Sequence, residues 1–163
     1  MIQETGLKCV VSGSFSKFKP QIDRTIEEFR DLGVQVLAPD TGGFLKPTHR
    51  ILRLGTDSFR PLITEAGMSV KQIENNFLAA IAHSDFQYIE APDGYVGNTV
   101  AFEIGFTIAQ GLLPYSRQPL STVLDLDPAW RTRIAKIETL DPTAVVSKIL
   151  AEKSNGQLWK FQE

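Results

Sequence analysis

Cysteine, histidine, surplus positive charge and long apolar runs are all scarce in this chain of 163 residues. The single cysteine, Cys9, stands within an apolar run, so it can form no internal disulfide and no clustered metal site. A lone thiol of this kind suits a reducing compartment. We therefore expect a cytoplasmic protein that binds no metal and no cofactor.

Positive charge is scarce as well. The 17 Lys and Arg residues are outnumbered by 19 Asp and Glu residues, which gives a formal net charge of -2 and an isoelectric point near 5.7. Polyanions bind through counterion release to a surplus of cationic side chains, so we expect no nucleic-acid partner, although a single nucleotide is compatible with this charge. No apolar run is long enough to span a bilayer, and no basic segment precedes an apolar stretch at the start. We expect a soluble, unprocessed protein with no membrane partner.

The two histidines, His49 and His83, form no nucleophilic or metal-binding constellation with residues nearby in the sequence. His83 is predicted at the end of a helix, where a cation interacts favourably with the helix dipole. Arg131, Arg133 and Lys136 are predicted on a solvated surface. None of these residues indicates a reaction.

Apolar segments alternate with helical patterns along the chain, which is 42% hydrophobic and 22% charged. This length and composition fit one compact domain over residues 1–163. Short apolar runs bounded by turn residues predict five strands, at Leu7–Val11, Val34–Ala38, Phe86–Ile89, Leu112–Tyr115 and Ile134–Ile137.

Characteristic residues mark the ends of the helices between these strands. They are Pro20 and Gly33 for the first helix, Ser69 with Gln72 for the second, and Asp141 with Pro142 for the last. Strands that alternate with helices predict an α/β fold. We expect a single doubly wound domain of flavodoxin or Rossmann-like type, with a five-stranded, mainly parallel sheet and helices on both faces.

Two segments do not follow this alternation. Residues 40–67 contain glycines and prolines among scattered bulky side chains. A structureless loop of that length is unusual in a compact domain, so we expect short helices or a mobile cover over a site. Residues 116–130 give no clear assignment.

Ligands of doubly wound sheets bind beyond the carboxyl ends of the strands, where the strand order reverses. This rule selects the loops at 12–19, after 34–38 and at 90–98. The first loop leads into a helix and carries polar groups that either hold a phosphate or form an ordinary solvated turn. These groups are the hydroxyls of Ser12, Ser14 and Ser16 and the ammonium groups of Lys17 and Lys19.

Two acids, Glu90 and Asp93, follow the third predicted strand. Paired acids can divide roles in catalysis, one ionised and the other donating a proton, if their environments differ. The sequence Pro92-Asp93-Gly94 is also a common turn, in which the aspartate bonds its own backbone. Asp93 is therefore either a ligand-contacting acid or a turn residue.

The helix predicted from Thr99 to Gly111 is apolar nearly all round, apart from one narrow stripe. That stripe consists of Thr99, Glu103, Thr107 and Gln110. It either faces water, with Glu103 favouring the positive end of the helix dipole, or faces a ligand, with the dipole keeping this carboxylate ionised. Gly105 favours the second interpretation, because glycine inside a helix costs about 1 kcal/mol against alanine and indicates a close approach.

The same helix bears on the oligomeric state. A helix that is apolar on most sides predicts burial against another subunit. Trp159 and Phe161, near the C-terminus, are expected to pack on the domain or on a partner subunit. We therefore expect a homo-oligomer.

Three short segments carry the pattern of a known family. Ser12-Gly13-Ser14-Phe15 follows the first strand, Glu74-Asn75-Asn76-Phe77-Leu78 precedes Ser84-Asp85, and Gly97 to Gly105 includes Ala101-Phe102-Glu103-Ile104-Gly105. Together they resemble the nucleoside 2-deoxyribosyltransferase superfamily, which also contains deoxynucleotide N-glycosidases. The resemblance extends from Leu7 to Tyr115, and the Ala-Phe-Glu-Ile-Gly segment is its most specific part.

This resemblance implies cleavage or transfer of the N-glycosidic bond of a deoxynucleoside, nucleoside or nucleotide as the small-molecule partner. It places the family's nucleophile or ion-pair partner on Glu103. Breaking the bond builds positive charge on the sugar, which a held carboxylate can stabilise or trap covalently. The residues expected to bind the substrate are Ser12, Gly13, Ser14, Phe15, Asp93, Tyr95, Gly97 and Asn98.

Two other functions fit the same residues. The family often has an aspartate where Phe77 stands here, which favours a non-catalytic nucleotide-binding or sensing module of the same fold. The segment from Pro92 through Gly97 and Thr99 to Glu103 loosely resembles the glycine-rich motif of phosphoribohydrolases that release cytokinin bases.

Overall fold

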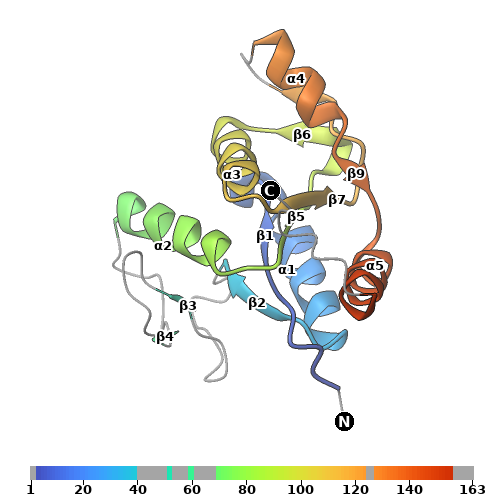
Figure 1. Cartoon of the computed structure of the whole chain (residues 1–163). Helices are drawn as coiled ribbons and strands as arrows, with labels where there is room; N and C mark the ends of the chain where they lie inside the picture. Colours follow the sequence, from blue (N-terminus) through green and yellow to red (C-terminus); the bar gives the residue numbers. More distant parts are fainter. Residues whose placement is uncertain (1–2, 40–50, 53–58, 61–68, 124–126, 156–163) are drawn as a thin grey trace.

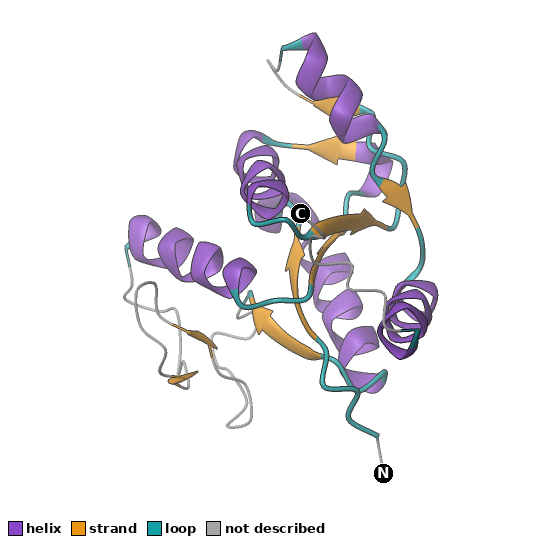
Figure 2. Ribbon diagram, viewed as in Figure 1, coloured by secondary structure: helices purple, strands orange, loops and turns teal. Residues whose placement is uncertain are grey.

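The computed structural model describes residues 3–39, 51–52, 59–60, 69–123 and 127–155. Its centre is a five-stranded, all-parallel sheet with helices on both faces (Figures 1 and 2). The predicted doubly wound α/β fold is thus confirmed. In spatial order the strands are β2 (Gln35–Ala38), β1 (Lys8–Ser12), β5 (Phe86–Ile89), β7 (Leu113–Ser116) and β9 (Glu138–Thr139).

Two helices cover each face of the sheet: α1 (Phe15–Asp31) and α5 (Pro142–Ser154) on one, α2 (Val70–Ala82) and α3 (Asn98–Ala109) on the other (Figure 1). Successive strand residues point to opposite faces, so each strand divides its side chains between two cores. In β1, Cys9 and Val11 pack with residues of α1 and α5, whereas Val10 packs with residues of α2. The short apolar strands are therefore buried on both sides.

The strand order reverses between β1 and β5. Helix α1 leads from β1 to β2, and α2 leads from β2 past β1 to β5. Ser12 at the carboxyl end of β1 pairs in register with Ile89 at the carboxyl end of β5. This is the position at which doubly wound sheets bind ligands.

The predicted helix ends are confirmed at three places. Gly33 has a φ of 78° after α1, a left-handed conformation that favours glycine. Ser69 and Gln72 form a reciprocal capping box at the start of α2. The Asp141 carboxylate accepts a hydrogen bond from the Ala144 amide at 2.9 Å at the start of α5.

Helix α1 begins earlier than predicted, at Phe15 rather than near Pro20. Phe18 interrupts it with a non-helical φ of -132° and ψ of 28°. Pro20 therefore lies in the first turn after the break, where its missing amide hydrogen costs no hydrogen bond. The serine-rich loop forms the first, separate turn of this helix.

The prediction of a strand at Ile134–Ile137 is wrong. Helix α4 (Pro128–Ala135) occupies the first half of this segment, the chain turns over the second half, and β9 follows. The Asp127 carboxylate caps the helix by accepting a hydrogen bond from the Ala129 amide at 2.8 Å. Ile134 is buried against α3. Ile134 lies in the last turn of this helix, whose start signal, Asp127 with Pro128, falls in residues 116–130, for which the sequence gives no clear assignment.

Short elements complete the description: the 3-10 turn η1 (Pro92–Gly94), β6 (Tyr95–Val96) paired with β8 (Thr122–Val123), and the hairpin of β3 (Ile51–Leu52) and β4 (Phe59–Arg60). The rest of residues 40–67, where short helices or a cover are expected, lies outside the described residues. The aromatic tail at Trp159 and Phe161 also lies outside them. Among the helices that the structure describes, none combines the length and the apolar character that crossing a bilayer demands.

Candidate functional site

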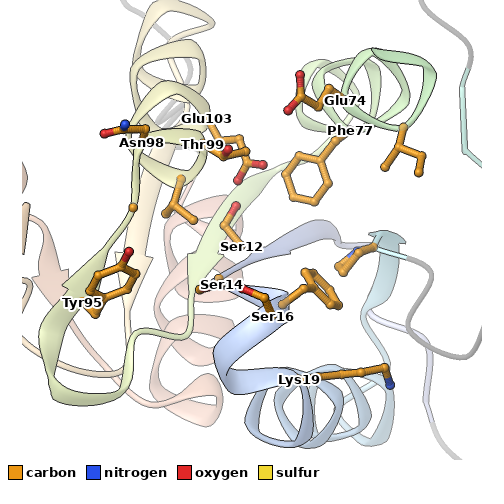
Figure 3. Close-up of a pocket in the computed structure, with 16 residues that line it drawn as sticks. Ser12, Ser14, Ser16, Lys19, Glu74, Phe77, Tyr95, Asn98, Thr99 and Glu103 are labelled. Atoms are coloured by element: carbon orange, nitrogen blue, oxygen red, sulfur yellow. Dashed lines mark hydrogen bonds between the residues drawn. The ribbon is translucent and has the colours of Figure 1, made fainter. Parts of the chain in front are cut away.

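A cavity of about 600 Å³ opens at the carboxyl end of β1, beside the point where the strand order reverses (Figure 3). Its walls come from the loop between β1 and α1, the residue after β2, the first half of α2, and the segment from β6 into α3. A volume of this size suits a small molecule. The predicted site residues in its lining are Ser12, Gly13, Ser14, Phe15, Tyr95, Gly97, Asn98 and Glu103.

Asp93 is the one predicted site residue that does not line this cavity. It is exposed and has a φ of 59°, between Pro92 and Gly94 in η1. The Gly94 amide donates to the Ala91 carbonyl at 2.8 Å and closes the turn. Asp93 therefore occupies the left-handed turn position that aspartate tolerates, as the turn interpretation requires.

The Glu103 carboxylate lies at the inner end of the cavity, beside Ser12 and opposite Phe77 (Figure 3). The pKa of Glu103 is raised from 4.5 to about 7: burial is the main cause, the Glu74 carboxylate also raises it, and the Ser12 hydroxyl opposes the rise as a hydrogen-bond partner. The helix dipole therefore does not hold the pKa of Glu103 at its ordinary value. Glu103 lies beyond the first turn of α3, where the dipole is weak and burial outweighs it.

Ser12 is fixed from below by the side chain of Gln87. Gln87 Nε2 donates a hydrogen bond to Ser12 Oγ at 2.8 Å. Both residues are almost fully buried. The hydroxyl that contacts Glu103 is thus held in place by the sheet.

The serine loop forms the wall below Glu103 (Figure 3). Ser14 Oγ and Ser16 Oγ lie 3.5 Å apart, which is a weak hydrogen bond at most. Lys19 also lines the cavity, and its Nζ donates to Asp23 Oδ2 at 2.7 Å. The loop therefore presents hydroxyls and one ammonium group whose charge is shared with an aspartate.

Tyr95 forms the wall on the other side and is held by the first turn of α1. Lys17 Nζ lies 3.9 Å from the centre of the Tyr95 ring, a cation–π contact. The Phe18 ring meets the same ring edge-on at 6.4 Å between centres. Lys17, one of the cations considered for a phosphate, is thus directed to an aromatic face.

Gly13 explains how the loop and the sheet pack so closely. A Cβ atom at this position would lie 2.7 Å from the Glu90 carbonyl oxygen and 2.7 Å from Ile22 Cδ1. No side chain fits in that space, so the backbone at the cavity floor depends on glycine here.

Glu90 has a structural role and does not form a catalytic pair with Asp93. It is 3% exposed, and its carboxylate accepts hydrogen bonds from Thr25 Oγ1, Arg117 Nε and Gln118 Nε2, each at 2.7 Å. Buried charges are found with such partners because an unpaired one is costly. Neither Glu90 nor Asp93 lines the cavity, so the two acids cannot divide roles there.

The residues expected to bind the substrate do not include all the lining residues. Glu74 and Phe77, which belong to one of the three segments of the family resemblance, line the cavity from α2 (Figure 3), and Pro39 lines it beyond β2. Glu74 and Phe77 are three residues apart, so they share a helix face, and that spacing is a further signal in the sequence. Pro39 follows the second of the strands whose loops the switch-point rule selects.

A second cavity, of about 590 Å³, lies between α3 and α4 on the outer side of α3. Its lining is apolar except for Asn98 and Arg133. Phe102 and Trp130 are 65% and 50% exposed beside it. We call this surface the α3–α4 face. Its lining residues are Asn98, Ala101, Phe102, Ile104, Gly105, Phe106, Ile108, Ala109, Trp130, Arg133 and Ile134.

Within the described part of the chain, α3 fully buries one stripe, Val100, Ile104 and Thr107, so the burial of its other apolar sides against another subunit stays a prediction. The expectation of a close approach at Gly105 is wrong for the described residues, since a Cβ atom there would meet none of them within 4 Å. Phe102 projects beyond the buried stripe, whereas Phe106 and Ile108 are partly buried against the core.

Comparison of the chain with protein-family models gave no match, and comparison with curated proteins and with solved structures gave none either. Within the described part of the chain, no group of three or more metal-ligating side chains comes together. Any function must therefore be argued from the cavity and its residues.

Proposed function

We propose that this protein cleaves or transfers the N-glycosidic bond of a nucleoside or nucleotide, with Glu103 as the nucleophile. The observation that carries this proposal is a half-buried carboxylate at the inner end of a small-molecule cavity, beside the Ser12 hydroxyl, with its pKa raised by burial. The segment around Glu103 is also the most specific part of the family resemblance.

The reaction needs few groups. A Glu103 carboxylate oxygen attacks the anomeric carbon, the bond from that carbon to the base breaks, and the base leaves with the bonding electrons and takes up a proton. Water or a second base then attacks the same carbon and releases the carboxylate. The sugar gains positive charge in both steps, and a desolvated carboxylate stabilises that charge more strongly than a hydrated one.

The cavity walls suggest which part of the substrate lies where. Gly13 and Ser14 belong to the loop that would line the sugar or phosphate side. Tyr95 and Asn98 would orient the sugar or base from the other side. Phe77 offers a flat apolar surface opposite Glu103 for the base.

The second candidate is a non-catalytic nucleotide-binding or sensing module. It is favoured by Phe77, which stands in the cavity where the family often has an aspartate. A module of this kind would retain the binding walls and lack the polar group that assists the reaction.

A product assay separates the two candidates. The protein is incubated with ribonucleosides, deoxyribonucleosides and their 5'-monophosphates, with and without a second free base, and the products are separated by chromatography. We expect a new base peak that the Glu103→Ala and Glu103→Gln variants do not produce. Asp93→Asn is the matched control, because Asp93 is an exposed acid outside the cavity.

A thermal-shift measurement on the same mixtures completes the test. Stabilisation by a nucleotide without any product would favour the binding module. Equal turnover in the Glu103 variants and the unaltered protein would refute the role of Glu103.

We also propose that two copies of the chain associate through the α3–α4 face. The face holds a projecting ring, Phe102, next to a hollow at Gly105. In a dimer with a two-fold axis, the Phe102 ring of each copy would lie against the hollow at Gly105 of the other copy. The same surface would then serve both copies. Among the described lining residues, Arg133 is the one charged group, and this near absence of charge suits the centre of a dimer interface.

A further inference from the structure

Gln87 is a buried amide whose presence the proposed reaction does not explain. It lies within β5 at 0% exposure, between Phe86 and Tyr88, in a strand that is otherwise apolar. An amide placed there is costly unless hydrogen bonds compensate it. Gln87 Oε1 has no hydrogen-bond partner among the described residues. The hydrogen bond from Nε2 to Ser12 is therefore what offsets the cost of burying this amide.

The direction of Gln87 follows from the strand. Phe86 and Tyr88 pack on the side of α1 and α5, so Gln87 points to the side of α2 and α3. Ile89, two residues on, packs with α3 on that same side. Gln87 is paired with Val10 of β1, two residues before Ser12. Its side chain therefore reaches diagonally across the two central strands to the base of the cavity.

The direction of these hydrogen bonds follows from which atoms can donate and which can accept. Gln87 Nε2 can only donate, so it occupies a lone pair of Ser12 Oγ. Ser12 has one hydroxyl proton, and the Glu103 carboxylate lies beside it in the cavity as an acceptor (Figure 3). A donor on the lower side of Ser12 leaves that proton available to the carboxylate.

We propose that Gln87 is a positioning residue for Glu103: it donates to Ser12 Oγ and so directs the Ser12 hydroxyl proton onto the Glu103 carboxylate. The consequence for turnover rests on the proposed function. The hydrogen-bond chain itself does not, because it exists in the free protein and can be measured there.

The hydrogen bonds from Gln87 through Ser12 oppose the effect of the other groups around Glu103. Burial and the Glu74 carboxylate of α2 both favour the protonated form, and the Ser12 hydrogen bond favours the ionised form. Lys19 of α1 shares the cavity, and its ammonium group pairs with Asp23. Substitution of Gln87 leaves these charges in place and frees the Ser12 hydroxyl to rotate away.

The test is a titration of Glu103 by NMR with ¹³C-labelled glutamate, its signal identified by its loss in Glu103→Gln. The Gln87→Met variant removes the donor at nearly constant volume. We expect it to raise the pKa of Glu103 by about half to one unit, since this is the usual effect of one hydrogen bond to a carboxylate. Ser12→Ala should give a similar or larger rise, and the double variant no more than Ser12→Ala alone.

Gln118→Met is the matched control. Gln118 Nε2 donates at 2.7 Å to Glu90, a different carboxylate, so its loss should leave the Glu103 titration unchanged. An unchanged Glu103 titration in folded Gln87→Met, or additive shifts in the double variant, would overturn the proposal.

A measurement on the unaltered protein covers the case in which Gln87→Met does not fold. The side-chain amide signals of Gln87 should shift with pH at the same midpoint as Glu103, and this shift should vanish in Glu103→Gln. Gln87 signals that do not change with pH would also overturn the proposal. If the titrations behave as expected but no base is ever released, the positioning proposal holds and the proposed reaction fails.

Discussion

The two sides of α3 differ in which kind of side chain is exposed to water. On the inner side, Glu103 lies in a cavity and its pKa is raised to about 7. On the outer side, the next residue back, Phe102, is 65% exposed. An ordinary amphipathic helix has the opposite arrangement, with the ring buried and the acid in water. This inversion fits the two proposals above, a small-molecule site on the inner side and association with a second copy on the outer side.

The largest effect expected from this comparison is in the pH dependence of turnover. A nucleophilic Glu103 must be ionised, so kcat/KM should be constant above about pH 8 and fall tenfold per unit well below pH 7. We expect about a hundredfold loss between pH 8 and pH 5. Initial rates of base release over this range, with circular dichroism to show that the fold persists, measure it. A rate that rises toward acid pH would assign Glu103 the role of a proton donor instead.

The next effect is on stability. The pKa of Glu103 is higher in the folded protein than in the unfolded chain, so the folded state binds the proton more tightly, and stability falls as pH rises from 4.5 to about 7. Above pH 7 the ionised carboxylate lowers the free energy of unfolding by its full amount. Because the group is partly solvated, we expect Glu103→Gln to raise the free energy of unfolding by about 2 kcal/mol at pH 8. At pH 4.5 it should have almost no effect.

Urea unfolding at the two pH values makes this comparison. A Glu103→Gln variant that is less stable than the unaltered protein at pH 8 would mean that the carboxylate has favourable partners and is not held at a cost.

The outer side should control association. Phe102→Gln removes the projecting ring, and we expect the dissociation constant of the dimer to rise by about tenfold or more, as for a central aromatic contact. Sedimentation velocity over a range of concentrations measures it. Leu150→Gln is the control, because Leu150 is a partly exposed apolar residue of α5, away from the α3–α4 face. An unaltered protein that stays monomeric at all concentrations would exclude this interface.

The smallest effect concerns Gly105. An alanine methyl group there meets nothing within 4 Å, so Gly105→Ala should stabilise the helix by about 1 kcal/mol. The same methyl group narrows the hollow and should weaken association severalfold. Unfolding should be measured with Phe102→Gln also present, so that the two effects separate. Destabilisation in that monomeric background would show that Gly105 has a packing role.

The parts of the fold that depend on local signals could be predicted from the sequence. The bounds of β5 are those predicted, Phe86–Ile89, because the run is apolar apart from Gln87 and is flanked by the acids Asp85 and Glu90. The capping box at Ser69 is a short-range signal and is also found. By contrast, α4 begins at a lone aspartate–proline pair, and β9 is two residues long. Its place in the sheet depends on pairing with β7, which no local pattern records.

The site divides in the same way. The loops at the carboxyl ends of β1 and β5 follow from chain topology, so the serine loop and the segment before Glu103 could be selected in advance. The contribution of Glu74 depends on the rotation of α2 against α3. The pKa of Glu103 depends on how much water that packing removes. Both are set by contacts between elements far apart in the sequence.

The hydrogen-bonded cluster that Glu90 forms with Thr25, Arg117 and Gln118 bears on how this protein could be redesigned. Its carboxylate joins three separate stretches of chain, through Thr25 in α1, Arg117 just beyond β7, and Glu90 itself after β5. Arg117 also pairs with Glu28 at 3.0 Å, which ties it a second time to α1. The floor under the cavity is therefore anchored independently of the walls. A library that varies residues 95–99 and the first turns of α2, and leaves Glu90 and Arg117 untouched, can change which molecules enter while the frame stays constant.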